Sequence, residues 1–566
     1  MNSNPLYVTA YACGATVLLA MNLDKEKISN LAGFAILCCP PGKPAFYLAN
    51  RINFNNGTEG LKENQWVPSN IAPFQKFRWV HCLQITEISG LYTYVVSAKY
   101  FIPGSQELEA KFSAVVKIDL TSRYKEGKIA FTRGYISSQA YADKFNNKPI
   151  RPRKKMLDFD TSSYEHQYEW LGGEARKLLF SFVQEAVEDP TISVDLFAYD
   201  FDEPDLIRNL EKLKGRLRAI LDDAPLHKSK TALEIVAAKR LKLSAGENNI
   251  FQGHFKRFSH NKIIIQKKNG KPIKVLTGSA NFSIRGFYVQ ANNVLVFDQA
   301  DIAEQYEKAF EEAFTNMKKF SRSFIASKWF DFTLDNIVPL SVSFSPHISH
   351  NVSLDLVQKS IKEAKSSVLF SVMTMDGKGP ILESLKNLMN RHDIYSYGVA
   401  QSGHGLDLFK PGVKTGKFTP FAYLKDSIPK NFKREWSGGT GHSIHHKFIV
   451  IDFNGENPIV FTGSSNFSSG GEESNGDNLI AIYNREAAAK YAVEAIRLTD
   501  HYHFRYRMKL AKDTRPLVLK RSDEWVKSYY EATNIKYKDR ELFTIDSATR
   551  DQNLPIIQFS EPIDPE

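Results

Sequence analysis

One internal repeat limits the fold of this chain more than any other feature of its sequence. Two segments carry the pattern His-x-Lys followed by Gly-Ser-x-Asn-Phe-Ser, and each position in the second segment lies 185 residues after its counterpart, without a gap. The matching pairs are His260 and His445, Lys262 and Lys447, Ser279 and Ser464, Asn281 and Asn466, and Asn293 and Asn478. A duplication this regular predicts two copies of one structural unit, related by a pseudo-twofold axis, with a site at their junction.

The repeated polar residues stand at the start of apolar runs. Ile, Val and Phe follow Lys262 and Lys447, which predicts a buried strand in each copy. Because side chains alternate across a strand, each histidine and the lysine two residues later lie on the same face. Folding alone explains such polar residues poorly, so we interpret them as the chemical groups of one shared pocket.

Strand-like and helix-like segments alternate around these motifs in both halves, which we assign to residues 161–338 and 339–510. Such alternation is typical of βαβ units. Stretches rich in Ala, Glu and Lys, at residues 301–319 and 485–498, predict a helix near the end of each half. The expected fold is therefore a duplicated α/β domain of mostly parallel mixed sheets flanked by helices.

Residues 1–146 have a different pattern, in which short β-like runs are separated by Gly, Pro and Asn. This pattern predicts an all-β sandwich of the immunoglobulin or fibronectin type, which we interpret as an accessory domain. Residues 147–160 read as a basic, proline-containing linker that polyanions would also attract. Residues 511–566 form a C-terminal extension with an acidic end, and the sequence indicates no function for it.

The chain is basic, with a net charge of +11 and a pI of about 9.1. This favours a polyanionic partner, either nucleic acid or an anionic phospholipid surface. The longest apolar runs are too short to cross a bilayer and no secretory signal precedes them, so we expect a cytoplasmic protein. The four cysteines lack a CxxC pair and zinc spacing, and we expect reduced thiols.

The paired HxK and GSxN elements resemble the HKD motifs of the phospholipase D superfamily, and the resemblance covers residues 164–504. It implies a phosphodiesterase that forms a phosphohistidine and needs neither a metal nor a cofactor. One imidazole would attack phosphorus and the other would protonate the leaving oxygen. The residues implied to hold the non-bridging oxygens are Lys262, Lys447, Asn281 and Asn466, with Ser279 and Ser464 supporting them.

The first copy departs from the family pattern at its motif aspartate. The second copy has Asp452 at this position, whereas the first has Lys267. The family resemblance implies that this aspartate supports structure rather than chemistry, so we expect activity to survive. Lys267 is also the one residue that favours a catalytically inactive first half.

A second difference between the copies concerns the groups that orient the histidines. Asp477 resembles the histidine-orienting carboxylate of the family, and its counterpart in the first copy is Asn292. A carboxylate stabilises an imidazolium, while an amide orients the ring without adding charge. We therefore expect His260 to be the neutral nucleophile and His445 the charged general acid.

Several charged neighbours of the motifs are weaker candidates. The basic residues that would contact a phosphate backbone, or would instead be solvated at a strand entrance, are Lys256, Arg257 and Arg434. The residues that packing or helix capping explains well enough are His442, His446, Asp200, Asp202 and Glu203.

The motifs do not select the substrate, because one constellation serves several phosphodiesters. The basic charge and the lack of a membrane-spanning segment favour a nuclease that cleaves DNA or RNA. A phospholipase D-type hydrolase or transferase acting on phospholipids is the alternative, and an inactive nucleic-acid-binding protein is a third reading. A tandem repeat makes the whole site within one chain, so a monomer suffices for chemistry and dimerisation stays open.

Overall fold

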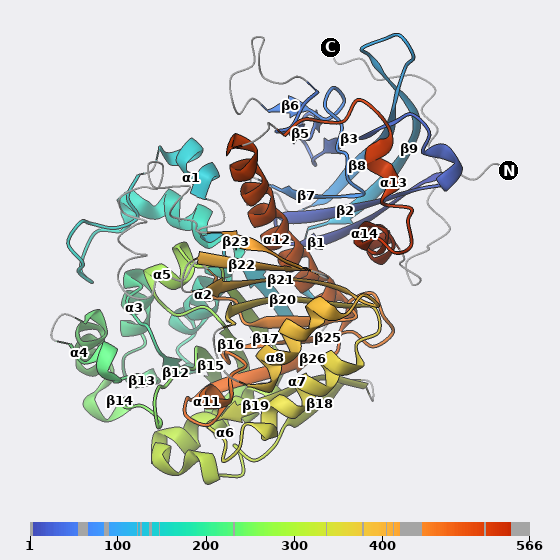
Figure 1. Ribbon diagram of the computed structural model, residues 1–566. Helices are drawn as coiled ribbons and strands as arrows, with labels where there is room; N and C mark the ends of the chain where they lie inside the picture. Colours follow the sequence, from blue (N-terminus) through green and yellow to red (C-terminus); the bar gives the residue numbers. More distant parts are fainter. Residues whose placement is uncertain are drawn as a thin grey trace. The chain divides into compact units, whose positions relative to one another are not determined.

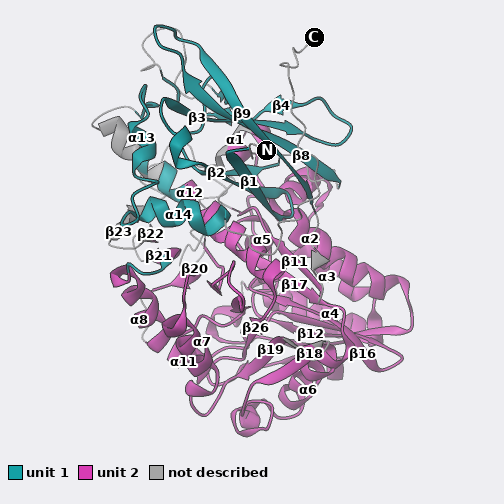
Figure 2. Cartoon of the chain, turned by 90° about the vertical axis from the view of Figure 1, so that its right-hand side faces the viewer, with its two compact units in different colours: residues 1–121, 392–395, 502–566 teal, residues 122–391, 396–501 magenta. Residues whose placement is uncertain are grey.

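The computed structural model describes most of the chain, and its elements are labelled in Figure 1. The described residues are 4–54, 66–83, 90–120, 123–124, 127–134, 138–146, 148–229, 232–334, 337–375, 379–402, 405–410, 413–418, 444–513 and 517–544. They form two compact units, coloured separately in Figure 2. Unit 1 comprises Met1–Thr121, His392–Tyr395 and Tyr502–Glu566, and unit 2 comprises Ser122–Arg391 and Ser396–His501.

Unit 1 is built from antiparallel strands, which confirms the predicted all-β region. The strands of its three-stranded sheet are, in order, β1 (Leu6–Cys13), β2 (Thr16–Leu23) and β7 (Arg78–Cys82). Those of its four-stranded sheet are β4 (Phe46–Tyr47), β3 (Leu31–Cys39), β8 (Leu91–Phe101) and β9 (Leu108–Asp119), and β5 (Ala49–Asn50) pairs with β6 (Val67–Pro68). Alternate residues of β8 are buried, as expected for a strand with one face toward a core.

Residues near the C-terminus complete the core of unit 1. This segment contains helices α13 (Glu524–Lys527) and α14 (Ile535–Thr544), and its Val526 and Tyr529 lie in the same apolar cluster as the strands. Trp525 donates its indole N–H to the carbonyl of Leu31 at 2.9 Å. The extension to which the sequence indicated no function is therefore part of the N-terminal β unit.

We expect Tyr529→Ala to destabilise unit 1. The Tyr529 ring is buried, with its centroid 4.9 Å from that of Phe77, and truncating a buried aromatic ring costs about 3–4 kcal/mol. Denaturant unfolding followed by Trp fluorescence measures the change. Lys527→Ala, on the exposed side of the same segment, should alter the free energy of unfolding by less than about 0.5 kcal/mol. Equal stability of the two variants would contradict the packing of this segment.

Unit 2 contains two large sheets. The strands of the 8-stranded sheet are, in order, β10 (Arg123–Tyr124), β11 (Gly127–Phe131), β17 (Asn293–Phe297), β16 (Lys271–Gly278), β15 (Ile263–Lys268), β12 (Ile192–Ala198), β13 (Leu217–Leu221) and β14 (Ile250–Gln252). Those of the 9-stranded sheet are β18 (Phe330–Leu334), β19 (Ile337–Ser345), β26 (Asp477–Ile482), β25 (Ile459–Gly463), β24 (Phe448–Ile451), β20 (Ser367–Thr374), β21 (Tyr395–Ser402), β22 (Gly405–Lys410) and β23 (Val413–Phe418). The adjacent strands β17, β16 and β15 repeat as β26, β25 and β24, which confirms the duplication.

Helices flank both sheets, as predicted. Those of the first half are α1 (Ser138–Phe145), α2 (Glu165–Glu188), α3 (Pro204–Glu211), α4 (Leu233–Ala245), α5 (Ile284–Tyr288) and α6 (Ala300–Asn316). Those of the second are α7 (Asn351–Glu363), α8 (Pro380–Asn387), α11 (Ser469–Glu472) and α12 (Arg485–Asp513). Helix α6 packs on β15 and β16, while α2 packs on β11 and β17, and α7 and α8 lie over the second sheet in Figure 1.

The prediction that the sheets are mostly parallel was wrong. In the first sheet β12–β13 and β13–β14 are parallel, but the other described pairings are antiparallel. The reason is the connection between the two motif strands: β15 and β16 are joined by a tight turn in which Asn269 and Gly270 have positive φ angles of 51° and 79°. A turn this short can join only antiparallel neighbours.

The compact units divide the chain differently from the predicted domains. Strand β11 pairs with β17, from Gly127 opposite Phe297 to Phe131 opposite Asn293, so these residues belong to the sheet of unit 2. The described part of the basic segment, residues 148–160, also belongs to unit 2. Its Arg151 is buried and forms an ion pair with Asp202 at 3.2 Å. Ile150 packs in the apolar core of unit 2, which explains why this segment is not an exposed linker.

Candidate active site

The two His-x-Lys pairs lie immediately before the central strands of unit 2. His260 and Lys262 precede β15, and His445 and Lys447 precede β24. All four side chains are buried. Burying ionisable groups is unfavourable unless they are paired or functional, so the surroundings of these four residues decide what they do.

Each GSxN motif begins with a glycine that no other residue could replace without strain. Gly278 and Gly463 end β16 and β25 with φ angles of 139° and 132°. A Cβ atom would lie 2.4 Å from the carbonyl oxygen of Asn293 in the first copy and of Asn478 in the second. The chain therefore passes close to the neighbouring strand at this point, where only glycine fits without strain.

The two histidines are oriented across the repeat. Nδ1 of His260 lies 2.7 Å from Oδ1 of Asp477, and Nδ1 of His445 lies 2.8 Å from Oδ1 of Asn292. Each ring therefore belongs to one half and its partner to the other. The expectation that Asp477 would set the charge of His445 was wrong, because the carboxylate faces His260.

The motif serines fix these partners. Ser279 donates to Oδ1 of Asn292 at 2.8 Å, and Ser464 donates to Oδ1 of Asp477 at 2.7 Å. Asn292 also donates its amide to the carbonyl of Gly286 at 2.9 Å, which assigns its Oδ1 as the atom that accepts from His445. Nδ1 of His445 thus carries a proton, which it donates to Asn292.

His260 favours its neutral form despite its carboxylate. Burial and the charge of Lys262 lower the pKa of His260 below its usual value, against the opposing effect of Asp477. With Nδ1–H donated to Asp477, Nε2 keeps a free lone pair. This is the tautomer that a histidine nucleophile requires.

The two motif lysines are buried amines, and burial lowers the pKa of each below its usual value. Burial lowers the pKa of Lys262 to about 8, although Asp477, Asp200 and Asp222 partly offset it. Nζ of Lys447 lies 3.2 Å from Nε2 of His445, and burial together with Lys262 lowers its pKa well below the usual range. A bound anion would favour the protonated form of both lysines.

The motif asparagines are held differently. Asn281 donates one amide hydrogen to Asp200 at 2.8 Å, and among the described residues the Oδ1 atoms of Asn281 and Asn466 have no hydrogen-bond partner. The amide of Asn281 has a second N–H group, which remains able to contact a phosphate oxygen. Contact of both asparagines with the substrate stays a prediction.

Three residues that support the first half-site were not predicted as such. Asp222 accepts the backbone N–H of Ser259 at 2.6 Å, and His227 lies between Asp222 and Asp200. Asp200 itself was attributed to helix capping, whereas Glu203 provides the N-cap of α3. The available signal was their position: Asp200 and Asp222 closely follow the buried strands β12 and β13, where functional side chains often gather in α/β folds.

The weaker candidates have separate outcomes. Lys256 is exposed. Arg257 donates Nε to Asn475 at 2.8 Å, which links the two halves. His446 is buried, and its Nε2 lies at hydrogen-bond distance, 2.8 Å, from Oε1 of Glu494, a packing role. Arg434 and His442 lie outside the described residues.

Lys267 is accommodated by an ion pair rather than by the site. Its Nζ lies 2.6 Å from Oδ2 of Asp195 and 3.4 Å from Glu307. Asp452, at the corresponding position of the second half, accepts backbone N–H groups of residues 365–367 and so anchors the start of β20. Both residues therefore stabilise the scaffold.

We expect Lys267→Asp, which restores the family residue, to be destabilising. The new carboxylate would face Asp195 and Glu307, although Asp195 keeps its pair with Arg218, so the cost should be about 2–3 kcal/mol. Thermal unfolding measures it. Lys268→Asp, at the exposed neighbour, should cost no more than about 1 kcal/mol, and a stable Lys267→Asp protein would refute the structural role of this lysine.

Comparisons with known proteins agree with this architecture. A family model described as "Cardiolipin synthase, PLD-like domain" matches residues 184–314 and 357–499. Comparison with curated protein sequences gives no match. The fold and the site define a duplicated phosphodiesterase domain with two HxK and GSxN motifs. The chain belongs to the phospholipase D superfamily.

Similar solved structures include three proteins of low sequence identity. Nuc from Salmonella typhimurium is 21% identical over 23% of this chain and 84% of its own, with a TM-score of 0.19. Phosphatidylserine synthase from Haemophilus influenzae is 12% identical over 68% of this chain and 100% of its own, with a TM-score of 0.40. Yeast tyrosyl-DNA phosphodiesterase is 11% identical over 53% of this chain and 84% of its own, with a TM-score of 0.27. The family assignment therefore rests on the motifs and the family model.

Proposed function

We propose that this protein is a metal-independent phosphodiesterase that acts through a phosphohistidine and cleaves nucleic acid. The observation that carries the proposal is the crossed pairing of the two histidines. It orients both rings through Nδ1, and it gives them unlike partners, a carboxylate behind His260 and an amide behind His445. All of these groups belong to one chain, so a monomer suffices.

In the first step, Nε2 of His260 attacks phosphorus and forms a P–N bond while the P–O bond to the leaving group breaks. Nε2–H of His445 gives its proton to the departing oxygen. Asp477 stabilises the positive charge that His260 gains when the P–N bond forms, whereas the amide of Asn292 orients His445 without adding charge. In the second step His445 takes a proton from water, which attacks the phosphohistidine and releases the second product.

The lysines support this reaction electrostatically. Lys262 and Lys447 would neutralise the non-bridging oxygens as negative charge develops on the pentavalent species. In many phosphodiesterases a divalent cation supplies this charge, and here two buried ammonium groups take its place. Asn281 and Asn466 would each contribute an amide N–H.

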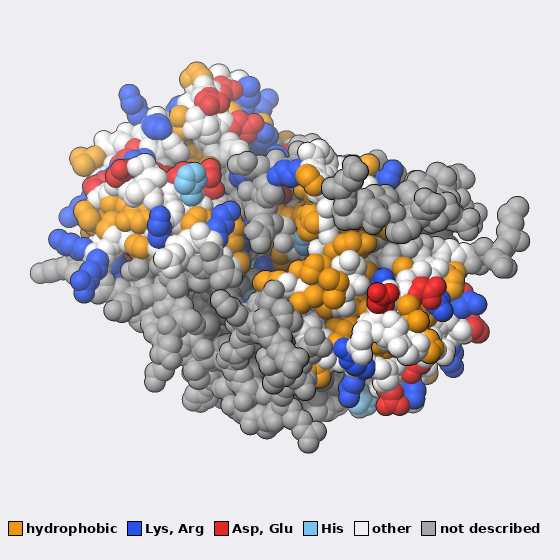
Figure 3. Space-filling model, turned by 90° about the horizontal axis from the view of Figure 1, so that it is seen from above, with side chains coloured by type: hydrophobic (Ala, Val, Ile, Leu, Met, Phe, Trp, Pro, Cys, Tyr) orange, Lys and Arg blue, Asp and Glu red, His pale blue; other side chains and the backbone are white. Residues whose placement is uncertain are grey.

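The preference for nucleic acid rests on charge. The chain carries a net charge of +11, and Lys and Arg side chains are spread over the described surface in Figure 3, interspersed with Asp and Glu. No helix among the described residues is long and apolar enough to cross a membrane. The description of the family model favours a second candidate, transfer or hydrolysis of a phospholipid headgroup, in which an alcohol or water attacks the same phosphohistidine.

One parallel assay separates these candidates. The protein and its His260→Ala variant would be incubated in EDTA with single-stranded DNA, duplex DNA, RNA, and vesicles of phosphatidylcholine and phosphatidylglycerol. We expect the protein to cleave nucleic acid in the presence of EDTA, and we expect His260→Ala to abolish this cleavage. Release of the headgroup without cleavage of nucleic acid would support the phospholipid enzyme instead of the nuclease. Tight DNA binding without cleavage of any substrate would indicate a binding protein.

The roles of the histidines are tested by trapping. With bis(p-nitrophenyl) phosphate, whose leaving group needs no general acid, His445→Ala should still form the phosphohistidine but lacks the group that activates water. The intermediate should therefore accumulate on His260, where mass spectrometry of peptides prepared at alkaline pH would find it. A phosphoryl group on His445 in the His260→Ala variant would reverse the assignment.

The pH dependence of kcat/KM should be bell-shaped, because that parameter reports groups of the free enzyme. Lys262 binds phosphate when protonated and its pKa is about 8, so its contribution to activity is present below this value and is lost as the pH rises through it. Protonation of His260, whose pKa lies below its usual 6.5, limits activity on the acid side. The arginine of Lys262→Arg keeps its charge at all these pH values, so the alkaline limb of this variant should shift to higher pH. An unchanged limb would exclude Lys262 as the group that causes it.

A further inference from the structure

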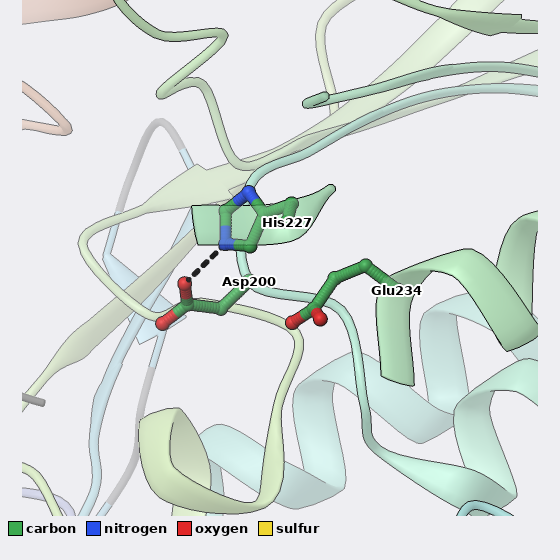
Figure 4. Close-up of side chains that lie close together, drawn as sticks. All are labelled: Asp200, His227 and Glu234. Atoms are coloured by element: carbon green, nitrogen blue, oxygen red, sulfur yellow. Dashed lines mark hydrogen bonds and ion pairs between the residues drawn. The ribbon is translucent and has the colours of Figure 1, made fainter. Parts of the chain in front are cut away.

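A buried histidine outside the two motifs joins two carboxylates in the first half of unit 2. His227 ends a short 3-10 helix, Pro225–His227, that follows β13. Its Nδ1 lies 2.7 Å from Oδ2 of Asp222 and its Nε2 lies 3.1 Å from Oδ1 of Asp200. Figure 4 shows the contact with Asp200 and places Glu234 beside it. We call Asp222, His227 and Asp200 the histidine bridge.

Each carboxylate of the bridge holds a different catalytic motif. Asp222 uses its other oxygen to accept the backbone N–H of Ser259, the residue before His260, at 2.6 Å. Asp200 uses its other oxygen to accept the side-chain amide of Asn281 at 2.8 Å. His227 therefore connects the HxK segment to the GSxN segment through one ring.

The charges around the bridge fit a protonated imidazole. Burial lowers the pKa of His227, but its hydrogen bonds to Asp200 and Asp222 outweigh this effect and raise the pKa to about 10. Arg285 adds a second positive charge, 2.9 Å from Asp200. Atoms of Asp200, His227 and Glu234 lie within 4.8 Å of one another, which is also a spacing that a metal ion would need. Both ring nitrogens already lie at hydrogen-bond distance from carboxylates. A protonated imidazole that donates one N–H to each carboxylate therefore explains the cluster without a metal.

We propose that His227 is a positioning residue of the first half-site, which sets the distance between His260 and Asn281 by bridging Asp222 and Asp200. It touches neither substrate nor reacting atoms. This inference rests on the proposed phosphodiesterase function for its effect on rate, whereas the geometry that it predicts can be measured without turnover.

Two isosteric variants separate the two contacts of the ring. In His227→Asn the side-chain amide takes the place of Nδ1, so the contact with Asp222 is kept and that with Asp200 is lost. In His227→Gln the amide reaches the place of Nε2, so the reverse holds. A control is His254→Gln, because His254 contacts the neighbouring Asp223 at 2.5 Å and this pair lies outside both motifs.

The first measurement is the rate with bis(p-nitrophenyl) phosphate, which any phosphodiesterase of this type should cleave. We expect kcat/KM to fall about 10- to 100-fold in both His227 variants, as for the loss of other orienting partners. His254→Gln should stay within about two-fold of the parent protein. Thermal unfolding of all three variants verifies that the comparison concerns folded protein.

The second measurement is the NMR spectrum of labelled protein, which does not depend on activity. In His227→Asn the side-chain NH₂ signals of Asn281 should shift while the backbone N–H of Ser259 stays protected from exchange. In His227→Gln, Ser259 should lose protection and Asn281 should stay unchanged. Identical spectra for the two variants, or perturbation of neither group, would overturn the inference. A parent protein inactive on every substrate would overturn the proposed function but leave this result to stand.

Discussion

The active centre depends on two hydrogen bonds that cross between the halves of the duplication. His260 is oriented by Asp477 and His445 by Asn292. Because each ring and its partner come from different halves, neither half contains a working histidine. Contacts such as Asn293 with Thr462 at 3.0 Å and Thr277 with Asn478 at 3.3 Å repeat the same crossing deeper in the fold. The two sheets must therefore meet in one register before any chemistry is available.

The same crossing makes the two half-sites chemically unlike. One difference between the copies, Asn292 in the first and Asp477 in the second, is enough to give one histidine a charged partner and the other a neutral one. Each half also contributes a lysine and an asparagine, although Asp200 holds Asn281 in the first half. Division of labour between nucleophile and acid thus needs few differences in sequence, and it leaves the shared scaffold intact.

Much of this arrangement could be predicted from the sequence, because the repeat keeps polar residues where strands favour apolar ones. His260, Lys262 and their counterparts were identified in this way. The short β-like runs predicted the all-β region, and the helix-like stretches predicted the flanking helices. The direction of the strands was not, since apolar runs look alike in parallel and antiparallel sheets. The partner of each histidine was also missed, because Asp477 belongs to the same half of the repeat as His445 but contacts His260 of the other half. His227 has no counterpart in any motif, and only its contacts show its place.

The packing of Trp525 and Tyr529 into the β unit has a consequence for synthesis. A ribosome delivers the chain from the N-terminus, and domains commonly fold as they emerge. The strands of residues 6–119 would appear first, yet their core includes side chains that are translated after the whole catalytic repeat. The earliest part of this protein to be made should therefore be among the last to reach its final form, and its apolar surface would need protection during that interval.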